Sequence, residues 1–189
     1  MSSLDESFRI LLEHLTQPNV LNPAQSDPIY YFVHNPSETF TVKQKLGVWS
    51  AQLRNQGWNV ITVSLSQILW DIVKASGRWE EWLQLESEAE SIAMNEAVRD
   101  VLRSGNTFVE AIAKYVLEAP SRTVVFLTDA HALHPYFRIR TLESGLHDRI
   151  KSPTIIFYPG RRSGQYGLHF LDFYPVDGNY RSTIIGGMA

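Results

Sequence analysis

Two continuous apolar runs, Thr123–Thr128 and Thr154–Tyr158, dominate the hydropathy pattern of the chain. Neither run alternates apolar and polar residues, which is typical of parallel strands that are covered by helices on both faces. An amphipathic segment with Pro135 near its start lies between them, and proline is well tolerated in the first turn of a helix. The pattern therefore predicts a β-α-β unit in the middle of an α/β sheet.

Apolar segments on the N-terminal side predict more strands and helices of the same kind. Ser64 and Gln67 are placed to cap one of these helices, because a serine hydroxyl accepts a hydrogen bond from a backbone N–H in the first turn. The predicted elements are a helix that ends near Leu15, a strand at Ile29–Val33, a helix closed by Gly57, a strand at Val60–Ser64 and a helix ended by Gly77. Such alternation is typical of a parallel sheet.

Residues 78–119 interrupt this alternation with a helical, acidic insertion that is divided by a break at Ser104-Gly105-Asn106. The insertion carries Trp79 and Trp82, and indole rings supply large apolar areas. The favoured interpretation is that both tryptophans pack the insertion onto the sheet. The alternative is that they anchor a protein partner.

The C-terminal part of the chain predicts two more strands, at Leu168–Tyr174 and Tyr180–Ile185. His169 and Asp172 interrupt the first of them on opposite faces, which indicates a strand near the edge of the sheet. The Asp177-Gly178 turn between the two strands favours an antiparallel closing hairpin.

Together these elements predict a single α/β domain over residues 1–189, with a three-layer and mostly parallel sheet. By analogy with P-loop NTPases, its strands would take the order fifth, first, fourth, third, second. A phosphate-binding loop needs glycines and a lysine at the start of the following helix. There is no glycine between Val33 and Leu46, and Lys43 and Lys45 lie inside the predicted helix. The predicted fold is therefore degenerate P-loop NTPase-like, without a Walker A motif.

Composition narrows the classes of function. The chain has no cysteine, which excludes disulfides, thiol nucleophiles and thiolate metal sites. Its first residues do not form a signal peptide and no apolar run is long enough to span a membrane, so we expect a cytoplasmic protein.

The formal net charge of −3 is unevenly distributed. Residues 1–119 hold 9 Lys/Arg against 15 Asp/Glu, and residues 120–189 hold 8 against 5, so the two parts carry −6 and +3. The basic residues are scattered, which favours an ordinary mixed surface. The alternative is a basic face that meets an acidic partner or phosphates.

Candidate site residues follow the two central strands, because open parallel sheets bind ligands at the carboxyl ends of their strands. We expect Gly160 to end its strand with a backbone conformation that other residues resist. Arg161 and Arg162 could bind phosphate or carboxylate, or could be solvated turn residues. The candidate ligand or partner residues are Asp129, His131, His134, Arg138, Tyr158, Gly160, Arg161 and Arg162.

No enzyme signature accompanies these residues. The Gly-x-Ser-x-Gly elbow and the HExxH motif are absent, and no pair of carboxylates can be assigned to acid–base catalysis. Asp129, His131 and His134 could form a metal-dependent hydrolase site, but no fourth ligand stands at a recognisable spacing. Helix capping and loop polarity explain the same residues. We therefore predict no catalytic residue, no metal and no cofactor.

Several segments resemble the BrxB family of BREX bacteriophage-exclusion systems. They are Ile-Tyr-Tyr-Phe-Val-His-Asn-Pro from residue 29, Val-Val-Phe-Leu-Thr from residue 124, Pro135 followed by Arg138, and Pro-Thr-Ile-Ile-Phe-Tyr-Pro-Gly from residue 153. The similarity covers nearly the whole chain, and its most specific part is the Phe-Tyr-Pro-Gly ending. The family pattern has Thr-Gly-x-Gly where this chain has Thr128-Asp129-Ala130-His131, so the resemblance gives Asp129 no family-wide catalytic role.

The resemblance implies a place in a multi-protein defence assembly. The implied partners are other BREX proteins: the phosphatase-like PglZ foremost, then the large ATPase BrxC and the DNA methyltransferase PglX. We therefore predict a non-catalytic adaptor or scaffold subunit of a phage-defence complex. The alternative is a nucleotide- or nucleic-acid-binding component that uses Arg161 and Arg162, and direct DNA contact stays open.

Overall fold

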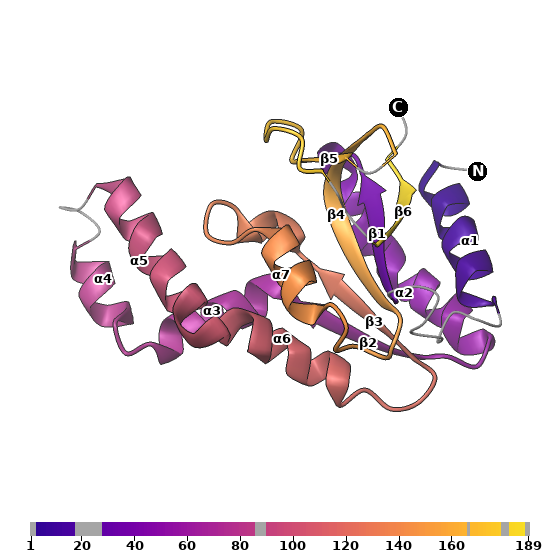
Figure 1. Ribbon diagram of the computed structural model, residues 1–189, viewed down its shortest axis with the longest axis horizontal. Coiled ribbons are helices and arrows are strands. Elements are labelled where there is room, and N and C mark those ends of the chain that lie inside the picture. Colours follow the sequence, from indigo (N-terminus) through magenta and orange to yellow (C-terminus); the bar gives the residue numbers. More distant parts are fainter. Residues whose placement is uncertain (1–2, 18–27, 86–89, 166, 179–181, 188–189) are drawn as a thin grey trace.

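A computed structural model describes residues 3–17, 28–85, 90–165, 167–178 and 182–187 (Figure 1). Its sheet is mixed but mostly parallel, as predicted. The strands are β1 (Ile29–His34), β2 (Asn59–Ser64), β3 (Thr123–Thr128), β4 (Thr154–Ser163), β5 (Gly167–Phe170) and β6 (Thr183–Gly186). They take the order β2-β3-β4-β1-β6, and all neighbours on this path are parallel. The expected order of the first four strands is confirmed, and β6 takes the place expected for the fifth.

Helices cover both faces of the sheet (Figure 1). They are α1 (Ser3–Leu15), α2 (Thr39–Asn55), α3 (Leu65–Ala75), α4 (Trp79–Leu85), α5 (Ser91–Arg103), α6 (Thr107–Leu117) and α7 (Ile139–Leu146). In β1, Tyr30 and Phe32 face the core under α1 and α2, whereas Tyr31 and Val33 face the core under the other helices. This two-sided burial explains why the strand is apolar without alternation. Among the described residues, no helix is long and apolar enough to cross a membrane.

Residues 79–85 and 91–117 form the helices expected of the insertion, and both tryptophans pack with the core on one face of the sheet, since Trp82 is buried in that core and Trp79 packs against it. Figure 1 shows α4 and α5 at the end of the molecule away from the sheet. Trp79 of α4 meets Trp70 of α3 edge to face, with ring centroids 6.0 Å apart. The insertion is therefore built outward from α3.

The prediction that Pro135 begins a helix was wrong. Residues Ala130–Leu133 form a short 3₁₀ helix, and α7 begins only at Ile139. His134, which precedes the proline, is extended with φ −73° and ψ 135°. Proline disfavours the helical region for the residue before it, so the chain cannot pass from the 3₁₀ turn directly into α7.

The predicted sharp end of β4 at Tyr158-Pro159-Gly160 was also wrong, because the strand continues to Ser163. It changes partner instead: residues up to Pro159 pair in parallel with β1, and residues from Gly160 onwards pair antiparallel with β5. Gly160 does not have a positive φ. A Cβ at this position would collide with the backbone carbonyl of His169, so the close approach of β5 requires the glycine.

The predicted closing hairpin is not formed by the last two strands. β5 pairs with β4, and β6 lies parallel beside β1. The turn at Asp177 folds back on β5 itself, since Leu168 and Asp177 exchange two backbone hydrogen bonds of 2.9 Å. The predicted start of the last strand at Tyr180 lies outside the described residues.

Candidate functional site at the carboxyl edge of the sheet

The carboxyl ends of β1, β2 and β3 meet at one edge of the sheet, where ligands of such folds bind. The register of β2 and β3 pairs Ser64 with Thr128, which brings Asp129 next to the end of β2. Ser64 also caps α3, as predicted: its Oγ accepts a hydrogen bond of 3.2 Å from the backbone N–H of Gln67. Strand pairing therefore brings together polar residues that lie 65 positions apart in the sequence.

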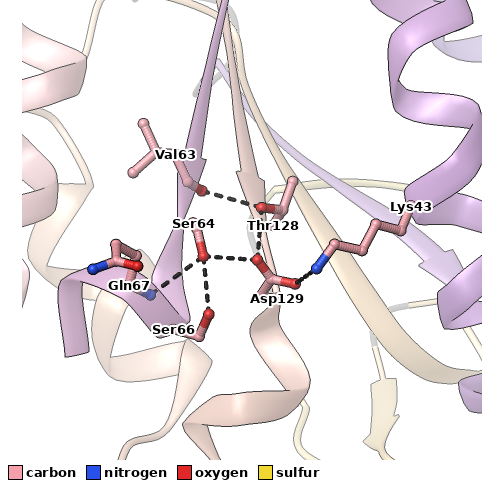
Figure 2. A network of polar contacts seen from close by, with 7 residues as sticks. All are labelled: Lys43, Val63, Ser64, Ser66, Gln67, Thr128 and Asp129. Carbon is pink, nitrogen blue, oxygen red and sulfur yellow. Dashed lines mark hydrogen bonds and ion pairs between the residues drawn. The ribbon is translucent and has the colours of Figure 1, made fainter. Parts of the chain in front are cut away.

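Both carboxylate oxygens of Asp129 accept hydrogen bonds from neighbouring side chains (Figure 2). Oδ2 accepts from Ser64 Oγ at 2.7 Å and from Thr128 Oγ1 at 3.3 Å. Oδ1 accepts from Lys43 Nζ at 3.2 Å. The Asp129 side chain is 13% exposed, whereas that of Lys43, which reaches over from α2, is 65% exposed. The carboxylate is thus enclosed by groups of this chain.

These contacts set the charge of Asp129. Burial by itself raises the pKa of the Asp129 carboxyl, but the hydrogen bonds from Ser64, Lys43 and Thr128, together with the positive charge of Lys43, outweigh burial and hold this pKa below its ordinary value. Asp129 is therefore ionised at neutral pH and paired with Lys43.

A small cavity adjoins this network, and its walls include Lys43, Asp129, His34 and His131. Its volume is about 20 Å³. A space of that size holds a water molecule or two, whereas small-molecule sites occupy roughly 300–1,000 Å³. This cavity by itself is therefore too small to enclose a nucleotide.

Two residues at this edge were not predicted as part of a site. Lys43 was considered only as a phosphate-binding lysine, but it pairs with Asp129. His34 ends β1 in the buried core, and burial holds the pKa of its imidazole below the ordinary value. Both residues could have been predicted from their position in the sequence, since the carboxyl ends of the strands and the first turns of the following helices converge at this edge.

The alternative metal set of Asp129, His131 and His134 is not assembled. His131 lies beside Asp129 at the cavity, but His134 belongs to a different cluster, where its Nδ1 is hydrogen-bonded to the Tyr174 hydroxyl. Desolvation, reinforced by the nearby positive charges of Arg138 and Arg99, lowers the pKa of His134. Within the described ranges, no three His, Asp or Glu side chains are placed to hold a metal ion.

The remaining candidates have separate structural roles. Arg138 lies over the ring of Tyr174, with 4.7 Å between the guanidinium carbon and the ring centroid. Tyr158 is buried in the core, edge to face with Tyr31 at a centroid distance of 5.5 Å. Neither residue takes part in the hydrogen bonds of Asp129.

Arg161 and Arg162 do not form a common anion site. They are successive residues of β4, so their side chains point to opposite faces of the strand. The Arg162 guanidinium donates hydrogen bonds of 3.0 Å to the carbonyls of Gly164 and Gln165, which ties down the turn after β4. Arg161 lies on the exposed side, 3.8 Å from the carboxylate of Asp172.

Comparison with known families gives one finding for this fold. A family model described as BREX protein BrxB matches residues 61–185, which is more than half of the chain and runs from β2 to β6. No match is found among curated proteins or among solved structures.

Proposed function

This chain belongs to the BrxB family of BREX proteins, and on that premise we propose that it works as a non-catalytic adaptor within the phage-defence complex. Family membership gives the role in BREX defence. The adaptor role is inferred from the site, because the conventional ligand position of the fold is occupied by the protein's own side chains.

The state of the Asp129 carboxylate carries this inference. A carboxylate that binds a metal or acts as a base needs an oxygen that faces the ligand. In this chain Oδ1 is paired with Lys43, Oδ2 is bonded to Ser64 and Thr128, and the adjoining cavity has about 20 Å³. These contacts favour a structural role for Asp129 in fixing the ends of β2 and β3 together with α2.

We also propose that the sheet is a P-loop NTPase-like frame that no longer binds nucleotide. The strand order β6-β1-β4-β3-β2 supports this proposal, because it matches the order expected for a P-loop NTPase sheet. The lack of glycine between Val33 and Leu46, and the contact of Lys43 with Asp129 rather than with a loop, support the loss of binding. Calorimetry with ATP and Mg²⁺ should detect no binding, and binding in the micromolar range would contradict the proposal.

The proposed partners are other BREX proteins, with PglZ foremost and BrxC or PglX as further candidates. The test is co-purification of the tagged full chain from cells that express the complete system. We expect the tagged chain to retain PglZ through washing at moderate salt. A chain that retains none of the system's proteins, while remaining folded and expressed, would contradict the adaptor role.

A further inference from the structure

A second hollow in the molecule lies in the helical insertion, away from the carboxyl edge. It opens between α3, α4 and α5, and we refer to it as the aromatic cleft. Its volume is about 410 Å³, which falls within the roughly 300–1,000 Å³ typical of binding pockets. The cleft walls include Trp70, Trp79, Trp82, Leu83, Met94 and Tyr136. None of the described residues that line it is charged.

The aromatic walls are held in place before anything binds. Trp70 packs edge to face against Trp79 on one side and against Tyr136 on the other, with centroid distances of 6.0 and 6.1 Å. Trp82 is buried, which anchors α4. The methionine wall adds adaptability, because a thioether side chain can adjust to different apolar partners. The cleft is therefore preformed on its aromatic side and adjustable at Met94.

Apolar surface continues out of the cleft into solvent. Leu83 lines the cleft and is 47% exposed, and the nearby Leu85 and Ile92 are exposed as well. Isolated exposed apolar residues are common, but exposed apolar residues on the same two helices as a concave aromatic surface favour an interaction site. This surface is available to a partner in the free protein.

The rim of the aromatic cleft, which we define as the segment 79–103 that carries α4 and α5, is acidic, with seven Asp/Glu against two Lys/Arg. Five exposed carboxylates lie directly beside lining residues in the sequence, namely Asp71, Glu80, Glu81, Glu90 and Glu96. The basic neighbours of lining residues are Arg78 and Arg99, and the Nε–H of Arg99 already donates a hydrogen bond to the Pro135 carbonyl at 3.0 Å. A cleft lined mostly by aromatic and aliphatic side chains and bounded by an acidic rim is complementary to a segment that is apolar on one side and basic on the other.

We infer that the aromatic cleft docks a basic amphipathic helix of a partner protein. Bulky aliphatic side chains of the helix enter the cleft beside Leu83 and Met94, and flanking lysines or arginines lie against the rim carboxylates. This is the helix-in-groove mode of recognition. The inference rests on the proposed adaptor function and deepens it, since it specifies the surface and the chemistry of the partner.

A direct test uses a synthetic peptide of about 18 residues with leucine on one helical face and lysine on the other. Its control has the same leucines with glutamate in place of every lysine. Calorimetry on the full chain should show binding of the lysine peptide at least about tenfold tighter than of the glutamate peptide. Added salt should weaken the binding, because the rim charges are solvent-exposed. Equal affinity for both peptides would overturn the charge-based part of the inference.

Matched variants locate the binding on the surface. Leu83→Lys places a like charge inside the cleft, and we expect it to weaken binding of the lysine peptide by at least about tenfold. Leu117→Lys is the control, since Leu117 on α6 is 49% exposed, close to the 47% of Leu83, and does not line the cleft. Glu80→Lys should weaken binding about threefold or more, whereas Glu118→Lys should leave it unchanged. Circular dichroism checks that all four variants are folded.

Co-purification with the complete BREX system tests the adaptor role and the aromatic cleft separately. If the wild type retains a system protein and Leu83→Lys retains at least about tenfold less, the cleft is the docking surface. If both retain it equally, the cleft inference is overturned while the adaptor role stands. If the wild type itself retains none, the adaptor role fails. Self-association of the chain that Leu83→Lys abolishes would assign the cleft to a second copy and would also overturn the inference.

Discussion

The carboxyl edge of the sheet and the aromatic cleft differ in almost every physical respect. At the edge, charged groups are paired with one another and enclose about 20 Å³, whereas the cleft leaves about 410 Å³ open between apolar walls. Polar groups that are paired within the chain stabilise the fold and have few hydrogen-bonding positions left for a ligand. An apolar surface that is exposed to water gains free energy when a partner covers it. We therefore expect substitutions at the edge to affect stability and substitutions at the cleft to affect binding.

The largest effect on stability is expected where the helical insertion packs into the main core. Leu102 on α5 is fully buried in the same core as β3 and α6. Leu102→Ala should lower the free energy of unfolding by about 2–5 kcal/mol, because it removes buried methyl groups and leaves a cavity. Urea denaturation followed by circular dichroism measures the change. A loss of stability confined to a separate early transition would show that the insertion unfolds on its own.

At the edge, Asp129→Ala should lower the free energy of unfolding by roughly 1–3 kcal/mol. The substitution removes a charge-assisted contact with Lys43 and leaves Ser64 and Thr128 without their common acceptor. Chemical denaturation at pH 7 provides the measurement. Asp100→Ala is the control, since Asp100 is exposed on α5, and it should change stability by less than about 0.5 kcal/mol. An Asp129→Ala protein as stable as the control would show that the network contributes nothing.

The Asp129 carboxyl should also make the free energy of unfolding depend on pH. The folded-state pKa of Asp129 is lowered from its ordinary value of 3.8, so its contribution to stability is complete above that value and is lost as pH falls through the lowered pKa. The stability difference between the wild type and Asp129→Asn should therefore be constant near neutral pH and shrink below about pH 4. Denaturation curves of both proteins at several pH values test this. A difference that grows on acidification would contradict the assigned direction of the pKa shift.

The smallest effect on stability is expected from Lys43. The Lys43 side chain is 65% exposed, so water can solvate its ammonium group in place of the Asp129 carboxylate. We therefore expect Lys43→Met to lower the free energy of unfolding by less than about 1 kcal/mol. Raising the salt concentration should reduce this difference further. Thermal melts at two salt concentrations are sufficient. A larger loss that does not depend on salt would show that the aliphatic stem of Lys43, and not its charge, supports the edge.

The sequence predicted best what local pattern determines. β3 was predicted with its observed bounds, because a strand buried on both faces leaves an uninterrupted apolar run. The cap of α3 by Ser64 followed from spacing alone. The helical insertion was likewise visible, because successive helical segments there interrupt the alternation of strands and helices.

The errors arose where tertiary contacts decide the structure. Pro159 and Gly160 resemble a strand end, but β4 continues because a new antiparallel partner approaches the glycine closely. The pairing of Lys43 with Asp129 joins residues 86 positions apart, which no local spacing encodes. The aromatic cleft was missed for the same reason: Trp70, Trp79 and Tyr136 come from separate segments.

The most direct test compares one variant of the carboxyl edge and one variant of the aromatic cleft in the same experiment. Tagged wild type, Asp129→Ala and Leu83→Lys are each purified from cells that express the complete BREX system, and the retained PglZ is quantified. The account predicts that Asp129→Ala retains PglZ at the level of the wild type, while Leu83→Lys retains at least about tenfold less. Loss of PglZ from Asp129→Ala together with full retention by Leu83→Lys would contradict it.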